Sequence, residues 1–196
     1  MKLAPEFFYA LLALCAVQRI AELVYSRRNV QKTEASTLHA SESRTAYAAM
    51  VLCHVLFFVL PALEVAHYGV QFPLWASLIA FVDFGLAQAL RLWAIRSLRE
   101  TWNVRAFIAE GQRVVTSGPY AYIRHPNYLA VLAEFVSVPL IGGAWRSMLF
   151  LNLIHLPVLL ARIRSEERVL RTHTGWAEAM GSKPALFPRS FEPDDA

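Results

Sequence analysis

Charged residues and cysteines are both scarce in this chain of 196 residues. Charged side chains make up 17% of the sequence, whereas a soluble domain usually carries about 25%. The two cysteines, Cys15 and Cys53, lie inside apolar blocks, and neither a CxxC pair nor a Cys/His cluster occurs. We therefore expect two buried thiols, with no disulfide framework and no metal site. The absence of GxGxxG, P-loop and HExxH motifs also excludes the usual soluble nucleotide-binding and zinc-hydrolase classes.

Hydrophobic residues, by contrast, make up 56% of the chain and are gathered in long blocks, which is typical of an integral membrane protein. The net charge of +4 and the isoelectric point near 9.3 are compatible with nucleic-acid binding. The arginines, however, lie between the apolar blocks and not along one polar face. The expected partners are therefore anionic membrane lipids, and not nucleic acid.

The apolar blocks predict the membrane segments, because about 20 mainly apolar residues are needed to cross a bilayer. A short block over residues 128–141 ends at Gly142-Gly143 and would reach only about 20 Å as a helix. We expect it to be a thinned or re-entrant span that forms a helical hairpin with the block after it. Four further blocks are long enough to span, at residues 5–24, 46–66, 74–95 and 145–163.

The distribution of arginine and lysine between these blocks predicts the orientation in the membrane. Residues 25–45, 96–127 and 164–196 are rich in arginine, whereas residues 67–73 contain neither arginine nor lysine. The arginine-rich stretches are therefore expected in the cytoplasm, with the N-terminus outside and the C-terminus inside.

The fold that these segments predict is all-α, an integral membrane protein with about five transmembrane helices. Residues 1–95 are expected to form three N-terminal transmembrane helices. Residues 96–196 are expected to form a cytosol-facing catalytic region, and the inner membrane of a bacterium is the expected location.

The stretch Ser117–Tyr128, SGPYAYIRHPNY, concentrates the unusual residue choices. Gly118-Pro119 predicts a turn, and His125-Pro126 predicts a second break in which Pro126 is the first residue of a helix. The start of that helix would direct free backbone N–H groups at a bound ligand. Such a turn can hold a ligand with a carboxylate and an aromatic ring, or it can be an interfacial turn with an aromatic belt. The side chains around it are Arg124, His125, Tyr120, Tyr122 and Tyr128.

A second group of charged residues, ARIRSEERVL over residues 161–170, follows the last apolar block. On a helix, Arg162 and Glu166 lie four residues apart and share one face. Glu167 lies one turn plus one residue beyond Arg162, so it can point into the same side of a wide pocket. The alternative is a solvated helix end with ion pairs.

Polar residues also interrupt the apolar blocks, and they are expected to face a bundle interior or a cavity, because a charge in hydrocarbon costs at least about 2–3 kcal/mol. We expect Asp83 to pair with another span and Arg91 to pair or to extend toward the interface. Glu134 lies close to the Asn127-Tyr128 turn and is the favoured site residue. His155 is expected to be a packing histidine with satisfied hydrogen bonds. The full set is Asp83, Gln88, Arg91, Glu134, Asn152 and His155.

From about residue 90 to residue 188 the chain resembles the isoprenylcysteine carboxyl methyltransferase family of integral membrane enzymes. The resemblance implies a cytosol-facing site for S-adenosylmethionine, formed by the turn and by the helix with the paired glutamates. It also implies a lipid substrate that enters from the bilayer between helices. The residues that carry it are VTSGPY at 115–120, RHPNY at 124–128, the hairpin that follows, and then Arg162, Glu166, Glu167 and Leu170.

Two departures from the family pattern concern the acceptor. Members often have Phe-Gly and two spaced tyrosines near the C-terminus, where this chain reads TGWAEAM over residues 174–180. Leu129-Ala130 also stands where a glycine usually follows the RHPxY motif, and AVLAE over residues 130–134 resembles the branch that O-methylates phenolic or pyrone lipids. The predicted acceptor is a lipophilic small molecule, either a prenylcysteine-like carboxylate or a phenolic or pyrone lipid.

The expected reaction is direct in-line methyl transfer to oxygen, in which alignment contributes about 7–11 kcal/mol at best. A phenol, with a pKa near 10, needs a base, for which Glu167, Glu134 and His125 are candidates, with Arg162 stabilising the phenolate. The predicted catalytic residues are Arg162, Glu167 and Glu134. The predicted cofactor-binding residues are Gly118, Pro119, Tyr120, Arg124, His125, Pro126, Tyr128 and Glu166.

Two other classes of protein stay open at this point. Sterol reductases are membrane enzymes that also carry RHPNY-like turns, and they bind NADPH. A non-catalytic membrane scaffold or carrier would bind neither cofactor. The paired glutamates that follow Arg162 favour the methyltransferase over the reductase, and a scaffold leaves the RHPNY turn without a purpose.

Overall fold

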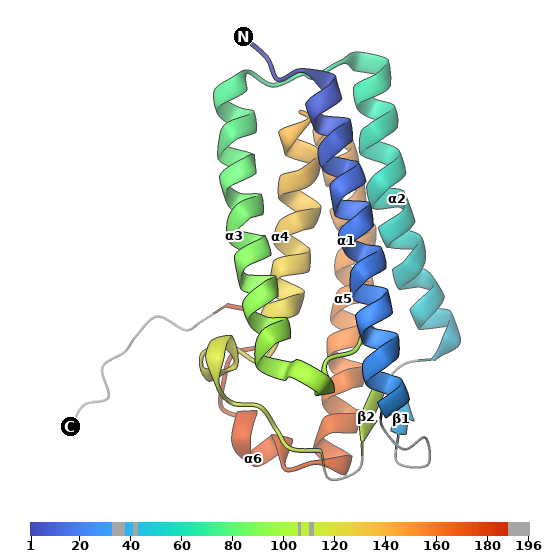
Figure 1. Ribbon diagram of the computed structural model, residues 1–196, viewed down its shortest axis with the longest axis vertical. Helices are drawn as coiled ribbons and strands as arrows, with labels where there is room; N and C mark the ends of the chain where they lie inside the picture. Colours follow the sequence, from blue (N-terminus) through green and yellow to red (C-terminus); the bar gives the residue numbers. More distant parts are fainter. Residues whose placement is uncertain (33–37, 41–42, 106, 110–111, 188–196) are drawn as a thin grey trace, which may run out of the picture.

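The chain forms a bundle of helices that run side by side (Figure 1). The computed structural model describes residues 1–32, 38–40, 43–105, 107–109 and 112–187, so the end of the predicted cytosolic tail lies outside the described residues. The helices of the bundle are α1 (Pro5–Lys32), α2 (Arg44–Tyr68), α3 (Leu74–Leu98), α4 (Pro126–Ile141) and α5 (Trp145–His173).

Four of these helices, α1, α2, α3 and α5, are long and apolar enough to cross a membrane, and α4 is a shorter apolar helix. Their outward faces carry large apolar side chains, since Leu14, Ile79 and Leu153 are 64%, 64% and 74% exposed. Water would disfavour such a surface, whereas lipid tails match it. The predicted multi-pass membrane protein is therefore confirmed, and Pro126 begins α4 as predicted.

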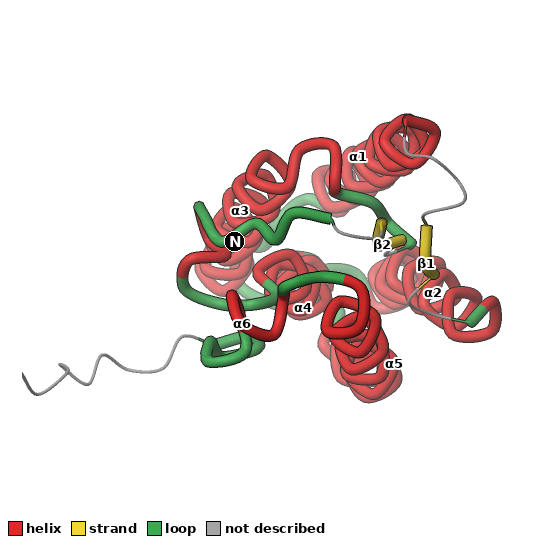
Figure 2. The backbone as a smooth tube through the Cα atoms, turned by 90° about the horizontal axis from the view of Figure 1, so that it is seen from below, coloured by secondary structure: helices red, strands yellow, loops and turns green. Residues whose placement is uncertain are grey.

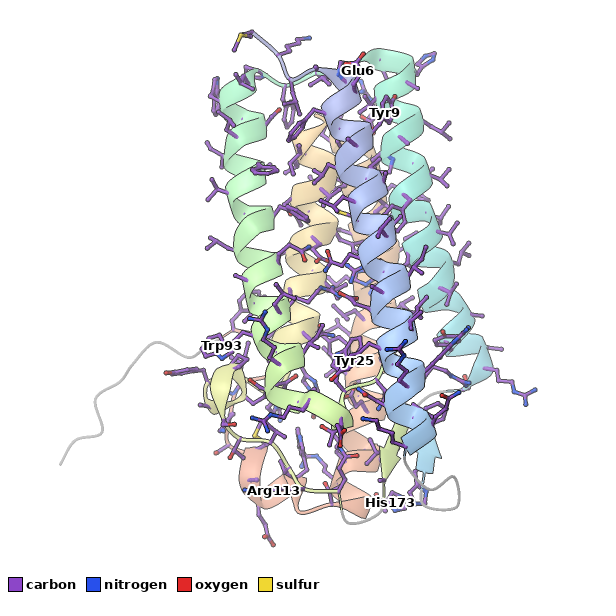
Figure 3. The ribbon with its side chains drawn as sticks, in the orientation of Figure 1. Glu6, Tyr9, Tyr25, Trp93, Arg113 and His173 are labelled. Carbon is purple, nitrogen blue, oxygen red and sulfur yellow. The ribbon has the colours of Figure 1, made fainter. Side chains whose placement is uncertain are left out.

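The α1–α2 connection, the α3–α4 connection and the segment after α5 meet at one end of the bundle, which we call the basic end (the lower end in Figures 1 and 3). Arg113 and His173 lie at this end, whereas Glu6 and Tyr9 lie at the opposite end (Figure 3). The short elements at the basic end are β1 (Leu38–Ala40), η2 (Arg99–Thr101), β2 (Phe107–Ala109), η3 (Gly118–Ala121) and α6 (Trp176–Met180).

The strands β1 and β2 form a two-stranded antiparallel sheet in which His39 pairs with Ile108. Figure 1 shows this sheet at the lower end of the bundle, and Figure 2, seen from below, shows it near the ends of α1 and α2. The all-α prediction omitted it, because strands of three residues are too short to show an alternating pattern. The sheet joins the α1–α2 connection to the α3–α4 connection.

The predicted helical hairpin is formed by α4 and α5, which are joined by a tight glycine turn. Gly143 has a φ of +69°, and a Cβ atom there would lie 2.7 Å from the backbone nitrogen of Phe72. Both the backbone conformation and the lack of space therefore exclude a side chain at this position. Glu64 of α2 accepts hydrogen bonds from the backbone nitrogen and the hydroxyl of Ser147, at 2.7 and 2.6 Å. This carboxylate therefore satisfies free donors at the start of α5.

A buried ion cluster ties α4 to α1 and α3. Arg91 donates to Glu134 through Nε and one terminal nitrogen, at 3.0 and 2.9 Å, and to Glu22 at 2.9 Å. Arg19 pairs with Glu22 at 2.9 Å and also with Glu134. Gln88 donates to Glu134 at 2.6 Å. The predicted pairing of Arg91 is confirmed, and two cations balance two anions inside the apolar region.

Asp83 does not follow this pattern. It lies exposed on the outer face of α3, and it has no partner among the described residues. The expectation that Asp83 pairs with another span is therefore wrong within this chain.

Candidate active site

A cavity of about 420 Å³ enters the bundle from the basic end and continues inward along α5. The side chains that α5 contributes recur every three or four residues, so they form one stripe of the helix. At 1.5 Å per residue the stripe is about 22 Å long. From the basic end inward its members are Leu170, Glu166, Arg162, Leu159 with its neighbour Val158, and His155.

Arg162 lies at the middle of this stripe and is 6% exposed. Its Nε donates to the hydroxyl of Tyr128 at 2.8 Å, and its guanidinium stands over the Tyr128 ring at 5.6 Å. A terminal nitrogen donates to the carbonyl of Val104, and another contacts the sulfur of Met50. Contacts to α2, α4 and the α3–α4 connection therefore fix the direction of the guanidinium.

The two neighbouring glutamates point to different places. The hydroxyl of Tyr128 donates to Glu166, which lines the cavity. Glu167 instead accepts a hydrogen bond from Nε2 of His125 at 2.9 Å and lies 3.3 Å from Arg124. The structure thus brings the turn and the paired glutamates together, with Glu166 on the cavity side and Glu167 behind His125.

The turn that precedes α4 adopts a backbone that requires glycine at its first position. Gly118 has a φ of +63°, and a Cβ atom there would collide with the hydroxyl of Ser97. Tyr120 follows, 7% exposed, and lines the cavity, and burial raises the pKa of its phenol above the ordinary value. Its hydroxyl therefore stays protonated. Tyr122 is 62% exposed and turns away from the cavity.

The segment after α5 covers this end of the cavity. Trp176 of α6 is buried against Tyr120, and the guanidinium of Arg124 lies 5.5 Å from its ring centre. The backbone nitrogens of Arg124 and His125 donate to the carbonyls of Pro184 and Ala185, each at 3.0 Å. The turn is therefore held by backbone bonds to a part of the chain that lies about 60 residues later.

The inner half of the cavity is mostly apolar and opens toward the side of the bundle. Leu23 of α1 and Val51 and Val55 of α2 line the cavity and are also 39%, 41% and 51% exposed. Residues that face both a cavity and the outside mark an opening, here between two helices that face the membrane. A lipid tail can occupy such an opening without leaving an apolar environment.

The structure divides the eleven predicted site residues into two groups. Five of them do not line the cavity that the described residues form. Gly118 and Pro119 form the turn, Pro126 starts α4, Glu167 holds His125, and Glu134 belongs to the ion cluster. The catalytic roles of Glu167 and Glu134 stay predictions. Six residues line the cavity, namely Tyr120, Arg124, His125, Tyr128, Arg162 and Glu166.

Sequence reasoning missed several cavity residues. Asn127 belongs to the recognised RHPNY stretch, and its side-chain oxygen is buried in the cavity wall without a partner among the described residues. Its place between Pro126 and Tyr128 is a signal that could have identified it. Tyr47, Met50 and His54 lie in an apolar block in which no local pattern distinguishes them.

Comparison with known proteins adds three similarities. The profile of the isoprenylcysteine carboxyl methyltransferase (ICMT) family matches residues 78–172, which include the turn, the hairpin and Arg162. The uncharacterized protein YpbQ of Bacillus subtilis (strain 168) is 33% identical over 168 residues, which is 85% of this chain and 98% of that protein. An uncharacterized protein of Haemophilus influenzae (strain KW20/Rd) is 27% identical over 121 residues, which is 61% of this chain and 69% of that protein.

Proposed function

This chain belongs to the isoprenylcysteine carboxyl methyltransferase family, whose members use S-adenosylmethionine, and we propose that it transfers the methyl group of this cofactor to an oxygen of a lipophilic acceptor. The observation that carries the proposal is one continuous cavity with two chemically different halves. The half at the basic end is charged and aromatic. The inner half is mostly apolar and opens between α1 and α2.

The charged half offers groups that complement the cofactor. The side-chain oxygen of Asn127, which has no partner among the described residues, could accept a hydrogen bond from the ammonium group, and Arg124 could pair with the carboxylate. Glu166 can accept hydrogen bonds from the ribose hydroxyls, and Tyr120 and Trp176 offer an apolar wall for the adenine. These residues therefore fit a ligand that combines opposite charges with an aromatic ring. The cofactor, when bound, supplies an electrophilic methyl group.

The apolar half supports a lipophilic acceptor, since its opening lies between membrane-facing side chains. A tail bound there would place the acceptor's polar group against Arg162, where the two halves meet. The acceptor is either a prenylcysteine-like carboxylate or a phenolic or pyrone lipid. In either case a bound tail and a bound cofactor would exclude bulk water from the reacting atoms, which would limit hydrolysis of the methyl donor.

Arg162 would act by orienting and stabilising the negative charge of the acceptor oxygen. Its fixed guanidinium needs little reorganisation when that charge arrives. Glu167 would hold the imidazole of His125 in one orientation at the cofactor. Glu134 would act from the ion cluster by fixing the wall formed by α4.

The arginine-rich connections support an orientation with the basic end in the cytoplasm, where the cofactor is made and consumed. We propose a bacterial inner membrane protein whose N-terminus lies outside and whose C-terminus lies inside. The α4 helix would complete five membrane segments as a short one. Residues 1–95 would supply the lipid-facing wall, and residues 96–196 most of the cofactor site.

Isothermal titration of the purified protein tests the cofactor. We expect binding of S-adenosylhomocysteine and no binding of NADPH; binding of NADPH alone would favour the reductase, and binding of neither would favour a scaffold. Incubation with labelled S-adenosylmethionine and a bacterial lipid extract should then label a lipid.

The variant Arg162→Ala tests the proposed centre in the same assay. We expect at least a 100-fold loss of labelling with helical circular dichroism unchanged, because a fixed charge at the reacting oxygen is lost. Arg28→Ala removes an exposed arginine of the same basic end and should keep activity. Full activity in Arg162→Ala contradicts the proposed centre.

A further inference from the structure

The inner end of the cavity is lined by two histidines, which lie among apolar side chains and the paired charges of the ion cluster. His54 comes from α2 and His155 from α5, and both line the cavity. Their ring centres lie 6.1 Å apart and the rings are perpendicular. Phe135 stacks on His155 at 3.8 Å and meets His54 edge-on at 5.3 Å. A shared aromatic support therefore fixes both imidazoles.

The hydrogen bonding of His54 determines which of its nitrogens carries a proton. Nδ1 lies 2.9 Å from the backbone carbonyl of Met50. Because a carbonyl only accepts, Nδ1 carries the hydrogen, and the neutral ring then keeps a lone pair on Nε2. This nitrogen offers an acceptor and no donor to a ligand in the cavity.

His155 adds a polar atom with no partner. The residue is 1% exposed, and its Nδ1 is buried without a hydrogen bond among the described residues. The expected packing of His155 is confirmed by its stack on Phe135, but the expectation that its hydrogen bonds are satisfied is wrong for Nδ1. A buried polar atom without a partner costs about 1–3 kcal/mol, so its presence in a cavity wall points to a ligand.

Of the two histidines, His54 is linked to the proposed reaction centre through Met50. Met50, whose carbonyl orients His54, also contacts Arg162 through its sulfur. The other charged groups that line this end are Arg19, Glu22 and Arg91, and the ion cluster pairs all of them. Among the described residues at the inner end, the unused hydrogen-bonding capacity therefore belongs to the imidazoles.

We propose that His54 and His155 bind the reacting group of the acceptor and that this group is a weakly acidic hydroxyl, such as a phenol or an enol. This inference rests on the proposed methyltransferase function. A hydroxyl donates to Nε2 of His54, whereas a carboxylate would bring its lone pairs against the lone pair of that nitrogen. His155 donates a second hydrogen bond to the oxygen of the same hydroxyl.

His54 also accepts the proton that the reaction releases. A lone pair of the hydroxyl oxygen forms the new bond to the methyl carbon, and the carbon–sulfur bond breaks with its electron pair on sulfur. The hydroxyl proton moves to Nε2 of His54, so the positive charge lost by the sulfonium is gained by the imidazolium. The oxygen becomes strongly acidic as the methyl arrives, so an imidazole is a sufficient base. The proton returns to water when the products leave.

Three lipids with the same tail test the proposal: dodecylphenol, dodecylbenzoic acid and a dodecyl-dinitrophenol, a nitrophenol that is already ionised at neutral pH. The purified protein is given labelled S-adenosylmethionine and each lipid in turn. We expect methylation of the phenol at least tenfold faster than of the benzoic acid. His54→Ala should lower the rate on the phenol about 100-fold but lower the rate on the ionised nitrophenol less than tenfold.

Controls separate this role from a structural one. Affinity for S-adenosylhomocysteine should stay within twofold in His54→Ala, and His67→Ala, at an exposed position of the same helix, should behave as the parent. Equal losses on both phenols, or a parent that methylates the benzoic acid as fast as the phenol, overturn the inference alone. A parent that binds no S-adenosylhomocysteine and labels none of the lipids overturns the proposed function as well.

Discussion

Replacement of Glu134 by leucine should destabilise the bundle strongly, because this carboxylate is the hub of the buried ion cluster. It is 1% exposed and accepts hydrogen bonds from Gln88, Arg91 and Arg19. Its removal leaves two guanidiniums and one carboxylate, the one of Glu22, in the apolar interior. The change therefore leaves one buried positive charge in excess.

The expected size of the effect follows from that excess charge. Breaking a buried pair by removing one partner costs about 3–5 kcal/mol, and an arginine at the centre of a membrane helix costs about 2.5–3.5 kcal/mol. We therefore expect a loss of about 3 kcal/mol in the free energy of unfolding, which for a chain of this size lowers the midpoint by about 6–12 °C. Thermal unfolding in detergent, followed by tryptophan fluorescence, measures this shift.

A double variant distinguishes charge imbalance from lost packing. Arg91→Met combined with Glu134→Leu leaves the pair of Arg19 and Glu22 and restores electrical balance. It should be more stable than Glu134→Leu alone, with a coupling of up to about 3 kcal/mol. Glu6→Gln, at an exposed site of α1, should change the free energy of unfolding by less than about 0.5 kcal/mol. A Glu134→Leu protein as stable as this control would refute the reasoning.

Three further variants concern the cavity wall. Tyr128→Phe removes the hydroxyl between Arg162 and Glu166, and should lower kcat/KM about 10- to 100-fold in the labelled-lipid assay. Glu167→Gln should weaken titrated S-adenosylhomocysteine binding about tenfold through a less ordered His125; a loss of about 100-fold or more in kcat with binding intact would instead make Glu167 the base. Gly118→Ala should cost about 1–3 kcal/mol in thermal unfolding, because its φ is positive; an unchanged midpoint would contradict the strain argument.

The helices and the turn could be predicted because their signals are local. An apolar block of about 20 residues predicts a span wherever it packs, and the start of α4 at Pro126 follows from the restricted φ of proline alone. The contact between the turn and Glu166 was predicted from the resemblance to a family, in which both motifs belong to one site.

The rest of the site depends on packing that no local pattern records. Glu166 and Glu167 are neighbours, and only the position of α4 decides that Tyr128 meets Glu166. Glu134 and Arg19 are 115 residues apart, so their ion pair requires knowledge of how α1 lies against α4. His54 lies in a block that is apolar on all sides, where hydrophobic periodicity cannot identify an inner face.

Polar atoms inside an apolar bundle serve two purposes that their partners distinguish. The carboxylates and guanidiniums of the ion cluster are paired with one another, so they stabilise the arrangement of α1, α3 and α4. The oxygen of Asn127 and Nδ1 of His155 are buried, lack partners among the described residues, and line the cavity. Asn127 lies beside Tyr128 at the charged half, and His155 lies two helical turns inward from Arg162. Two separated groups that each need a partner are what a cavity for two ligands requires, one bound from the basic end and one from the membrane.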